Sequence, residues 1–371
     1  MPEQPKICYL LGAGASYNSL PLVNEIAIDL ERMLKYLCDY NSLYLRTFDF
    51  DLNRDFKQYH SILSEIKEHF SVDTLARKYW LIKNNIVERK EKQWWENRYI
   101  RLKNIIACLI TFRRLKLVDY SVNHNDILIE SYTDSYDELG ERISKSRKSF
   151  KIDPRYDALF SAILSPNLSL PENIKIISWN YDFQIEQSFN FFQSHKSLKE
   201  TGNQLGIDYS KESIGPIVKL NGSAILYNGA TMETFKEYDR ETHQVFINAL
   251  KDSSDPSIYS GIKFSWEQEG FISTNRILAA NYIAECDYVV SIGYSFPIFN
   301  RETDIQIFEN FGKIGEGKIF IQAPEPDAIR FKGQLESIKE GLSKDAEIVT
   351  NLDQFFVPNQ FWKPESGPIY A

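Results

Sequence analysis

Residues 7–16 read Ile-Cys-Tyr-Leu-Leu-Gly-Ala-Gly-Ala-Ser, and this stretch decides the fold. Five apolar residues in a row, closed by a glycine, are typical of a buried parallel strand that enters a tight turn. From Val23 to about residue 37, apolar side chains recur at helical spacing. A strand, a Gly-rich turn and a helix form the first part of a βαβ unit, so the chain is predicted to be an α/β protein.

Five further apolar runs predict the other strands of the sheet. They are residues 174–178, 218–220, 288–292, 318–322 and 347–350. Helical patterns lie between most of them, and the loops that follow them carry Gly, Asn and Ser. This pattern predicts a doubly wound, mostly parallel, Rossmann-like sheet whose ligand lies along the carboxyl ends of its strands.

The stretch between the first two strands is mainly helical in pattern. Two apolar faces mark it: Ile62, Leu63, Ile66 and Phe70, and then Ile100, Leu102, Ile105, Ile106, Leu109 and Ile110. The 371 residues suffice for more than one domain. We expect residues 1–38 and 166–371 to form the α/β domain and residues 39–165 to form a helical inserted domain.

Composition excludes several classes of protein. With 43% hydrophobic residues, 24 Phe, 21 Tyr and 6 Trp, the chain is not intrinsically disordered. Its 4 cysteines form no Cys-x-x-Cys pair, which argues against a zinc ribbon and against a disulfide-stapled secreted scaffold. No apolar run approaches the roughly 18 residues of a membrane-spanning helix. A soluble protein in a reducing cytoplasm is the expectation.

Charge is distributed unevenly within a net charge of −8. Residues 77–116 hold twelve lysines and arginines against only Glu88, Glu91 and Glu96, together with three tryptophans and Tyr99. Aromatic and basic side chains serve protein interfaces and nucleic-acid surfaces alike. A solvated helix face whose tryptophans point inward would give the same residue pattern. The sequence leaves these three interpretations open.

The turn at Gly12-Ala13-Gly14-Ala15-Ser16 carries the best local signal for a ligand. A Gly-rich turn between strand and helix lets backbone N–H groups approach a pyrophosphate. The dehydrogenase pattern Gly-x-Gly-x-x-Gly would need glycine where Tyr17 stands, and no Lys-Ser/Thr follows as in a P-loop. Hydride-transfer enzymes and NTPases are therefore disfavoured, and a tight turn without a ligand is the alternative.

Three more polar stretches follow predicted strands. They are Ser178-Trp179-Asn180-Tyr181-Asp182, Lys219-Leu220-Asn221-Gly222-Ser223 and Gly293-Tyr294-Ser295-Phe296-Pro297. Asn180 and Asp182 can both point into one cleft, and Glu25, Glu186 and Asp304 lie near the motifs. Any one of these stretches, taken alone, is explained as a polar loop at a strand end that has no function. Four of them at the same edge of one sheet predict a site.

In this order, the four motifs resemble those of the sirtuin-like superfamily, in particular the bacterial NAD-consuming proteins of anti-phage defence systems. The matching positions are 12–16, 179–182, 219–223 and 293–297. The resemblance covers residues 7–30 and about 172–325 well, and the helical stretch only loosely. The combination is specific, although no single motif is.

The resemblance implies a sirtuin-like NAD site. In such a site Gly12, Ala13, Gly14, Ala15 and Ser16 hold the pyrophosphate, while Asn180 and Asp182 face the nicotinamide ribose. Gly293 and Ser295 touch the adenosine half, and Gly222, Ser223 and Tyr294 complete the predicted cofactor-binding set. Deacetylases of the superfamily carry a four-cysteine zinc module that this sequence lacks. Neither zinc nor an acyl-lysine peptide is therefore expected.

Asn221 departs from the family pattern because it stands where the family has a histidine that acts as general base. Asparagine cannot accept a proton usefully at neutral pH. Losing one general base typically slows an enzyme by about 10² to 10⁴, and the neutral nicotinamide leaves without a general acid. The predicted catalytic set is Asn180, Asp182 and Asn221. The histidines of the chain all lie outside the motifs: His60, His69, His124, His195 and His243.

Two functions follow from the resemblance. The first is an NAD glycohydrolase effector that depletes NAD during phage infection and acts in an assembly with a HerA-type ATPase, a short Argonaute module or further copies of itself. The second is a weak or inactive NAD- or ADP-ribose-binding subunit that regulates or scaffolds such a partner. A third class, direct nucleic-acid contact by residues 77–116, lacks a recognisable metal-binding carboxylate cluster.

Overall fold

The computed structural model describes most of the chain. The described residues are 4–21, 25–40, 52–69, 71–116, 135–136, 142–143, 152–193, 197–207, 209, 213–229, 231–233, 235–236, 238–252, 257–267, 270–312, 317–344 and 346–362. They form two compact units. The first unit comprises residues 1–16, 154–222 and 263–371, and the second comprises residues 17–153 and 223–262.

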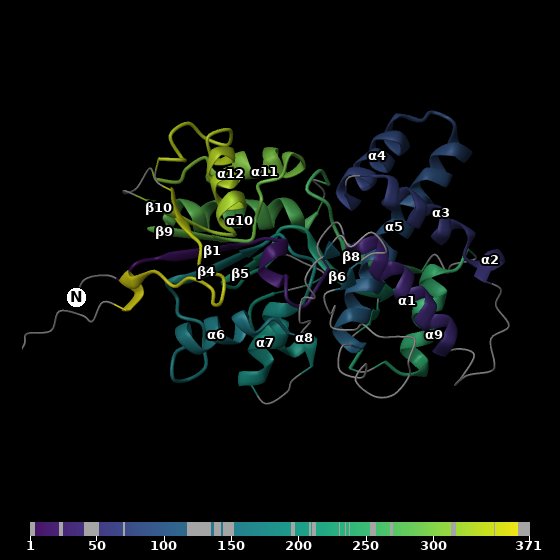
Figure 1. Cartoon of the computed structure of the whole chain (residues 1–371), viewed down its shortest axis with the longest axis horizontal. Coiled ribbons are helices and arrows are strands. Elements are labelled where there is room, and N and C mark those ends of the chain that lie inside the picture. The colour runs from purple at the N-terminus through teal and green to yellow at the C-terminus, as the bar shows by residue number, and fades with distance from the viewer. Residues whose placement is uncertain are drawn as a thin grey trace, which may run out of the picture. The chain divides into compact units, whose positions relative to one another are not determined.

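A six-stranded sheet forms the centre of the first unit (Figure 1). Its strands are β1 (Ile7–Leu11), β4 (Ile174–Ser178), β5 (Ile217–Lys219), β9 (Tyr288–Ile292), β10 (Lys318–Gln322) and β11 (Ala346–Val349). Every pairing is parallel, in the order β11-β10-β9-β1-β4-β5. The predicted doubly wound parallel sheet is confirmed, and its strand order is that of a Rossmann fold, with the switch point between β1 and β9.

Helices cover both faces of this sheet. Figure 1 shows α10, α11 and α12 on one side and α6, α7 and α8 on the other. Their bounds are α6 (Pro154–Ile163), α7 (Gln184–Phe192), α8 (Leu198–Gln204), α10 (Phe271–Glu285), α11 (Arg301–Phe308) and α12 (Glu325–Leu335). All five residues of β1 are buried, because a central parallel strand has both faces covered. Short 3₁₀ turns occupy Ala13–Ser16, Ile298–Asn300 and Asn359–Trp362.

The second unit combines helices with a small sheet. Its helices are α1 (Ile26–Tyr40), α2 (Leu52–Asp55), α3 (Lys57–Glu68), α4 (Val72–Asn85), α5 (Arg89–Lys116) and α9 (Arg240–Leu250). β6 (Gly222–Asn228) lies between β7 (Thr231–Glu233) and β8 (Ile258–Ile262). The short strands β2 (Ser135–Tyr136) and β3 (Arg142–Ile143) pair separately. The sequence patterns predicted neither of these sheets.

The bounds of the two units differ from the predicted domains. α1 belongs to the second unit because its buried residues pack with α3 and α5. Residues 223–262 also belong there, since α9 and β8 contact α5. Residues 154–165, which we expected in the helical insertion, belong to the first unit, where residues 154–163 form α6.

Most of the basic segment at 77–116 lies on α5, and much of it points inward. Leu102, Ile105, Ile106 and Leu109 are buried as predicted, whereas Ile100 is 40% exposed. Among the basic residues whose side chains the structure describes, four are buried as well: Arg98, Arg101, Lys103 and Arg113. The segment is therefore not one continuous basic surface.

The buried cations of α5 have internal partners. Arg101 donates to the carbonyls of Leu250, Lys251 and Asp252 at 3.0, 2.6 and 3.1 Å, where α9 ends and its carbonyls carry partial negative charge. Arg98 donates to the Tyr79 hydroxyl at 2.9 Å and pairs with Glu65. These contacts hold the second unit together, and they leave Lys78, Arg89, Lys90 and Lys92 as the exposed cations of the segment among the described side chains.

Candidate functional site

The four predicted motifs meet at one edge of the six-stranded sheet. Leu11, the last residue of β1, is in register with Ser178 of β4 on one side and with Ile292 of β9 on the other. Ser178 is in turn in register with Lys219 at the end of β5. Gly12, Trp179, Leu220 and Gly293 therefore leave four neighbouring strands at the same level. The expectation that these loops lie together is confirmed, while the role of each residue stays a prediction.

Glycines allow two of these loops to touch across the switch point. A Cβ atom on Gly12 would lie 2.5 Å from the Tyr294 Cα, and one on Gly14 would lie 2.8 Å from the Gly293 Cα. Gly293 has a φ of +58°, in the left-handed region that glycine enters without strain. Only glycine fits at these three positions. The Gly-rich loop and the loop after β9 form one packed rim.

The backbone amides of this rim are partly committed within the protein. Gly12 N donates to the Ile292 carbonyl and Gly14 N to the Gly293 carbonyl, each at 3.0 Å, and Ala15 N donates to the Gly12 carbonyl at 2.9 Å. We expected the amides of residues 12–16 to face a pyrophosphate. Three of them instead fix the shape of the loop, whose residues 13–16 form a 3₁₀ turn.

Ser16 is the centre of a buried polar cluster. Its Oγ donates to the Asp182 Oδ2 at 2.7 Å and lies 3.2 Å from the Tyr156 hydroxyl. The Asn180 Nδ2 donates to the Gly12 carbonyl at 2.9 Å and to the Ser16 Oγ at 3.3 Å. The structure thus brings the first two predicted motifs into direct contact, and it adds Tyr156, which the sequence did not single out.

Asp182 serves the loop rather than an open cleft. Its Oδ1 accepts the Gln184 N–H at 3.0 Å, and its Oδ2 accepts Ser16. Burial raises the pKa of this carboxyl, although Lys219 and the two hydrogen bonds act to lower it. We expected Asp182 to face the nicotinamide ribose. In the structure both of its oxygens have protein partners, which makes it a positioning residue with a charge close to the site.

The side-chain oxygen of Asn180 remains available as a hydrogen-bond acceptor. The two side-chain hydrogen bonds that Asn180 makes to described residues use the amide nitrogen, and its backbone N donates to the Ser178 Oγ at 3.1 Å. The bonds to Gly12 and Ser16 fix the orientation of the carboxamide, so the Oδ1 is an acceptor held in a defined direction. A water molecule or a sugar hydroxyl can donate to such an atom.

A buried ion pair lies directly behind this cluster. The Lys219 ammonium contacts the Glu186 Oε1 at 2.7 Å and donates to the Asp182 backbone carbonyl, and Tyr209 donates to the same Glu186 oxygen at 3.0 Å. Glu186 is fully buried and Lys219 nearly so. Two charges survive at such a depth only when each is paired and hydrogen-bonded. The pair ties the end of β5 to the start of α7 and to the Asp182 loop.

Asn221 lies at the turn between β5 and β6. Its Nδ2 donates to the Trp179 carbonyl at 3.2 Å, and its Oδ1 is buried without a hydrogen bond among the described residues. The Trp179 ring stacks on the Tyr294 ring with centroids 5.4 Å apart and an interplanar angle of 11°. Asn221 therefore presents an oxygen acceptor and no titratable group.

Hydrogen bonds of the Tyr294 hydroxyl fix the loop after β9. Tyr294 donates to the two carboxylate oxygens of Asp304 at 2.8 and 3.0 Å, and the Asn300 Nδ2 donates to the Tyr294 oxygen at 3.1 Å. Burial raises the pKa of Asp304 well above its ordinary value. The next residue, Ser295, is exposed, and its contact with a ligand stays a prediction. Gly222 has a φ of +66°, and Ser223, the first residue of the second unit, is buried.

None of the described histidines belongs to the first unit. His60, His69 and His243 are residues of the second unit, and His124 and His195 fall outside the described residues. His243 is fully buried, its Nδ1 lies 2.9 Å from the Tyr238 hydroxyl, and burial lowers its pKa to about 4. His243 is therefore neutral at physiological pH.

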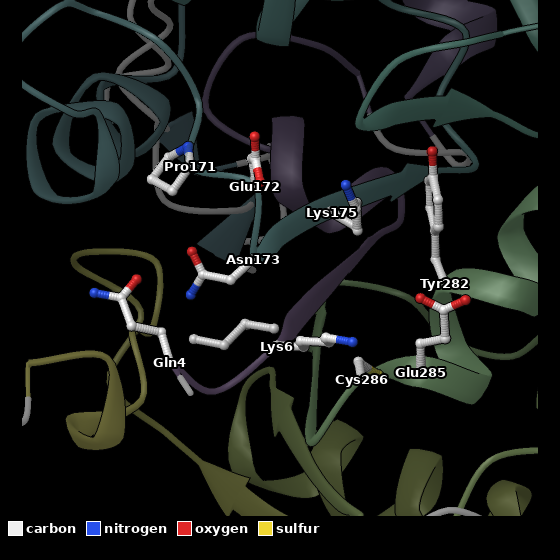
Figure 2. A pocket seen from close by; sticks show the side chains of 10 residues that line it. Gln4, Lys6, Pro171, Glu172, Asn173, Lys175, Tyr282, Glu285 and Cys286 are labelled. Atoms are coloured by element: carbon white, nitrogen blue, oxygen red, sulfur yellow. The ribbon is translucent and has the colours of Figure 1, made fainter. Parts of the chain in front are cut away.

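A cavity of about 560 Å³ opens at the opposite end of the sheet, near the start of β1 and β4. Figure 2 shows Lys6, Lys175, Tyr282 and Glu285 around it, with the Lys175 ammonium 5.2 Å from the centroid of the Tyr282 ring. Acidic and basic side chains balance here. This cavity lies at the amino ends of the strands, whereas Rossmann ligands bind at the carboxyl ends.

Among the described residues, no helix is long and apolar enough to cross a bilayer. The same residues contain no group of three or more His, Cys, Asp or Glu side chains arranged to hold a metal ion.

The likeness of this chain to known proteins is distant. No protein-family description matches the sequence, and no curated protein matches it. Among solved structures, the chain is similar to Sir2 in a complex with the inhibitor EX-527, 2′-O-acetyl-ADP-ribose and a deacetylated p53 peptide. The identity is 14% and the TM-score 0.31, and the match covers 54% of this chain and 66% of the Sir2 chain. A likeness this distant assigns neither a family nor an activity.

Proposed function

We propose that this chain binds NAD at the carboxyl edge of its parallel sheet and hydrolyses it to nicotinamide and ADP-ribose. One observation carries the proposal: the Gly-rich loop and the Asn180–Ser16–Asp182 cluster meet at the switch point of a sheet with Rossmann strand order. Dinucleotides bind at that point of such sheets. The motif resemblance to sirtuin-like NAD-consuming proteins selects NAD among the dinucleotides.

The reaction requires little acid chemistry from the protein. The bond between the anomeric carbon and the nicotinamide nitrogen breaks, its electron pair stays on nicotinamide, and the positive charge moves to the ribose as an oxocarbenium ion. Water then forms the new carbon–oxygen bond and loses a proton to the solvent. Asn180 Oδ1 orients the water, and the Asp182 charge favours the cationic state through space.

Asn221 favours a second function. Because the carboxamide cannot take a proton from water at neutral pH, the site lacks the family's general base. A protein that binds NAD or ADP-ribose without turnover, and regulates or scaffolds a partner, fits the same pocket chemistry. The two functions differ in whether nicotinamide is released.

The test is nicotinamide release, followed by mass spectrometry after incubation of the purified chain with NAD, alone and with candidate partner proteins. Three variants accompany the native chain: Asn180→Ala, Asn221→His and, as a matched control, Asn203→Ala on the exposed face of α8. Hydrolysis by the native chain that falls about 10²-fold in Asn180→Ala and is unchanged in Asn203→Ala supports the glycohydrolase.

The other outcomes decide against it. NAD binding without turnover in every assembly, with activity created by Asn221→His, establishes the binding subunit. If neither the native chain nor Asn221→His binds NAD in calorimetry, both functions are overturned.

The biological setting belongs to the same proposal. An enzyme that consumes NAD harms its own cell, so its activity has to await a trigger, and anti-phage defence supplies one. Assembly with a HerA-type ATPase, a short Argonaute module or further copies of the chain is the proposed control. On α5, Trp94 is 48% exposed next to the cations Arg89, Lys90 and Lys92, and aromatic side chains are enriched at protein interfaces.

A further inference from the structure

The segment after β11 is fastened to the carboxyl end of β10. Gln322, the last residue of β10, is buried and donates from Nε2 to the carbonyls of Asn351 and Gln354 at 2.5 and 2.6 Å. Its Oε1 accepts the Phe356 N–H at 3.0 Å. One side chain thus uses both ends of its amide to hold residues 351–356, which we name the C-terminal strap.

Phe355 of the strap reaches the first turn of α6. Its ring meets the Tyr156 ring edge-on, with centroids 4.9 Å apart and an interplanar angle of 86°, and the Arg155 guanidinium lies 4.9 Å from its centroid. Phe355 is 4% exposed. Figure 1 shows the yellow C-terminal end of the chain close to α6, although almost 200 residues separate them in sequence. Phe355 thus contacts two successive residues of α6.

These two residues of α6 hold the Gly-rich loop. Arg155 donates from Nη2 to the carbonyls of Gly14 and Ala15 at 3.0 and 3.2 Å, and the Tyr156 hydroxyl lies 3.2 Å from the Ser16 Oγ. A peptide group is planar, with its N–H opposite its C=O. Fixing two successive carbonyls therefore also fixes the direction of the amides of Ala15 and Ser16.

We infer that Phe355 and Gln322 are positioning residues for the NAD site, acting on the Gly-rich loop through Arg155 and Tyr156. The inference rests on the proposed function for its ligand, but the chain of contacts holds without one. Phe355 of the strap contacts both Arg155 and Tyr156. Its attachment thereby sets how rigidly the backbone of the loop is held where the proposed phosphate would bind.

A simple packing role would give a different result. Phe356, the next residue, has a ring of the same size that packs on Phe320 of β10 with centroids 4.7 Å apart, and no ring contact or cation contact links it to α6. If the strap only fills space, shortening Phe355 or Phe356 has similar effects. If it positions the loop, only Phe355 affects residues 12–16.

The experiment compares Phe355→Ala with Phe356→Ala and adds Gln322→Ala, which releases the whole strap. Hydrogen exchange of the peptide that spans residues 10–16 is followed by mass spectrometry without a ligand, and NAD affinity is measured by calorimetry. The amides of Gly12, Gly14 and Ala15 are hydrogen-bonded, so their exchange reports the loop. We expect Phe355→Ala and Gln322→Ala to speed this exchange and weaken NAD binding by about tenfold, and Phe356→Ala to change each by less than about twofold.

Equal effects of Phe355→Ala and Phe356→Ala, or unchanged exchange in Phe355→Ala, would overturn the inference. Should Phe355→Ala fail to fold, Phe355→Leu retains most of the apolar volume without a ring and gives the same comparison. If the native chain binds no NAD, the proposed function fails, and the exchange data still decide whether the strap positions the loop.

Discussion

Ser16 is linked by side-chain hydrogen bonds to three other residues of the site: Tyr156, Asn180 and Asp182. Replacing it by alanine leaves the buried Asp182 Oδ2 without its donor and the Asn180 amide with one partner fewer. Because an unpaired buried polar group is costly, we expect Ser16→Ala to lower the free energy of unfolding by about 1–3 kcal/mol. We also expect nicotinamide release to fall at least about tenfold. Urea unfolding and the release assay measure the two effects.

Ser291 supplies the matched control. It lies in β9 and is buried, but its Oγ has no hydrogen bond among the described residues. Removing this hydroxyl takes away no partner, so Ser291→Ala should be neutral or slightly stabilising. A loss as large as that of Ser16→Ala would show that any buried serine of the sheet matters equally, which contradicts a special role for Ser16.

At the same scale, only part of the site could be predicted. Ser16, Asn180 and Asp182 follow apolar runs, and residues after parallel strands share one edge, so their meeting could be expected. Arg155 and Tyr156 lie about 140 residues from the loop they hold, and no spacing in the sequence connects them to it. The direction of the Asp182 carboxylate depends on hydrogen bonds from the Ser16 hydroxyl and the Gln184 N–H, which no spacing in the sequence indicates. That this carboxylate faces the nicotinamide ribose stays a prediction.

At the scale of elements, the contact between the turns after β1 and β9 depends on glycine. A Cβ atom on Gly293 would overlap the backbone of Gly14, and the positive φ adds strain. We expect Gly293→Ala to lower the free energy of unfolding by at least about 2 kcal/mol and to abolish NAD binding, because the two loops must separate. Urea unfolding and calorimetry test this prediction.

Gly333 is the control for that change. It lies within α12, and a Cβ atom there would meet no heavy atom within 4 Å. Gly333→Ala should therefore stabilise the protein by about 0.5–1 kcal/mol through helix propensity and a less flexible unfolded chain. If both substitutions changed the free energy of unfolding equally, the close contact of Gly293 with Gly14 would not contribute to stability.

The strands of the parallel sheet were predictable, whereas the small sheet was not. β1, β4, β9 and β10 have the predicted bounds because short apolar runs between helices leave few other possibilities. β6 is buried over six residues without polar alternation, and its first two residues were attributed to a ligand motif. The basic segment could not be interpreted from the sequence either. A count of charges does not reveal that Arg101 points inward and donates to the carbonyl at the end of α9.

At the scale of the whole molecule, His243 makes stability depend on pH. Its pKa is lowered to about 4 in the folded protein by burial, against an ordinary value of 6.5. Between these values the unfolded chain binds a proton that the folded chain does not, so the free energy of unfolding decreases as pH falls from about 6.5 to about 4. His243→Phe keeps a ring in contact with Tyr238 and removes the titration.

Urea unfolding of both proteins at pH 7, 6 and 5 checks this expectation. The native chain should lose more stability than His243→Phe over this range, since all other titrating groups are common to the two. Parallel loss in both proteins would mean that the ring is protonated in the folded state.

The place of β1 in the middle of its sheet has a consequence for biosynthesis. Residue 7 is in register with residue 174 on one side and with residue 288 on the other. During translation the first strand therefore cannot pair on both sides until both neighbouring strands have been synthesised. The loop at residues 12–16 can contact the loop after β9 only after residue 293 has left the ribosome. A nascent chain that ends before residue 293 therefore carries the first motif without the assembled rim, and the proposed NAD hydrolysis cannot begin at that stage of translation.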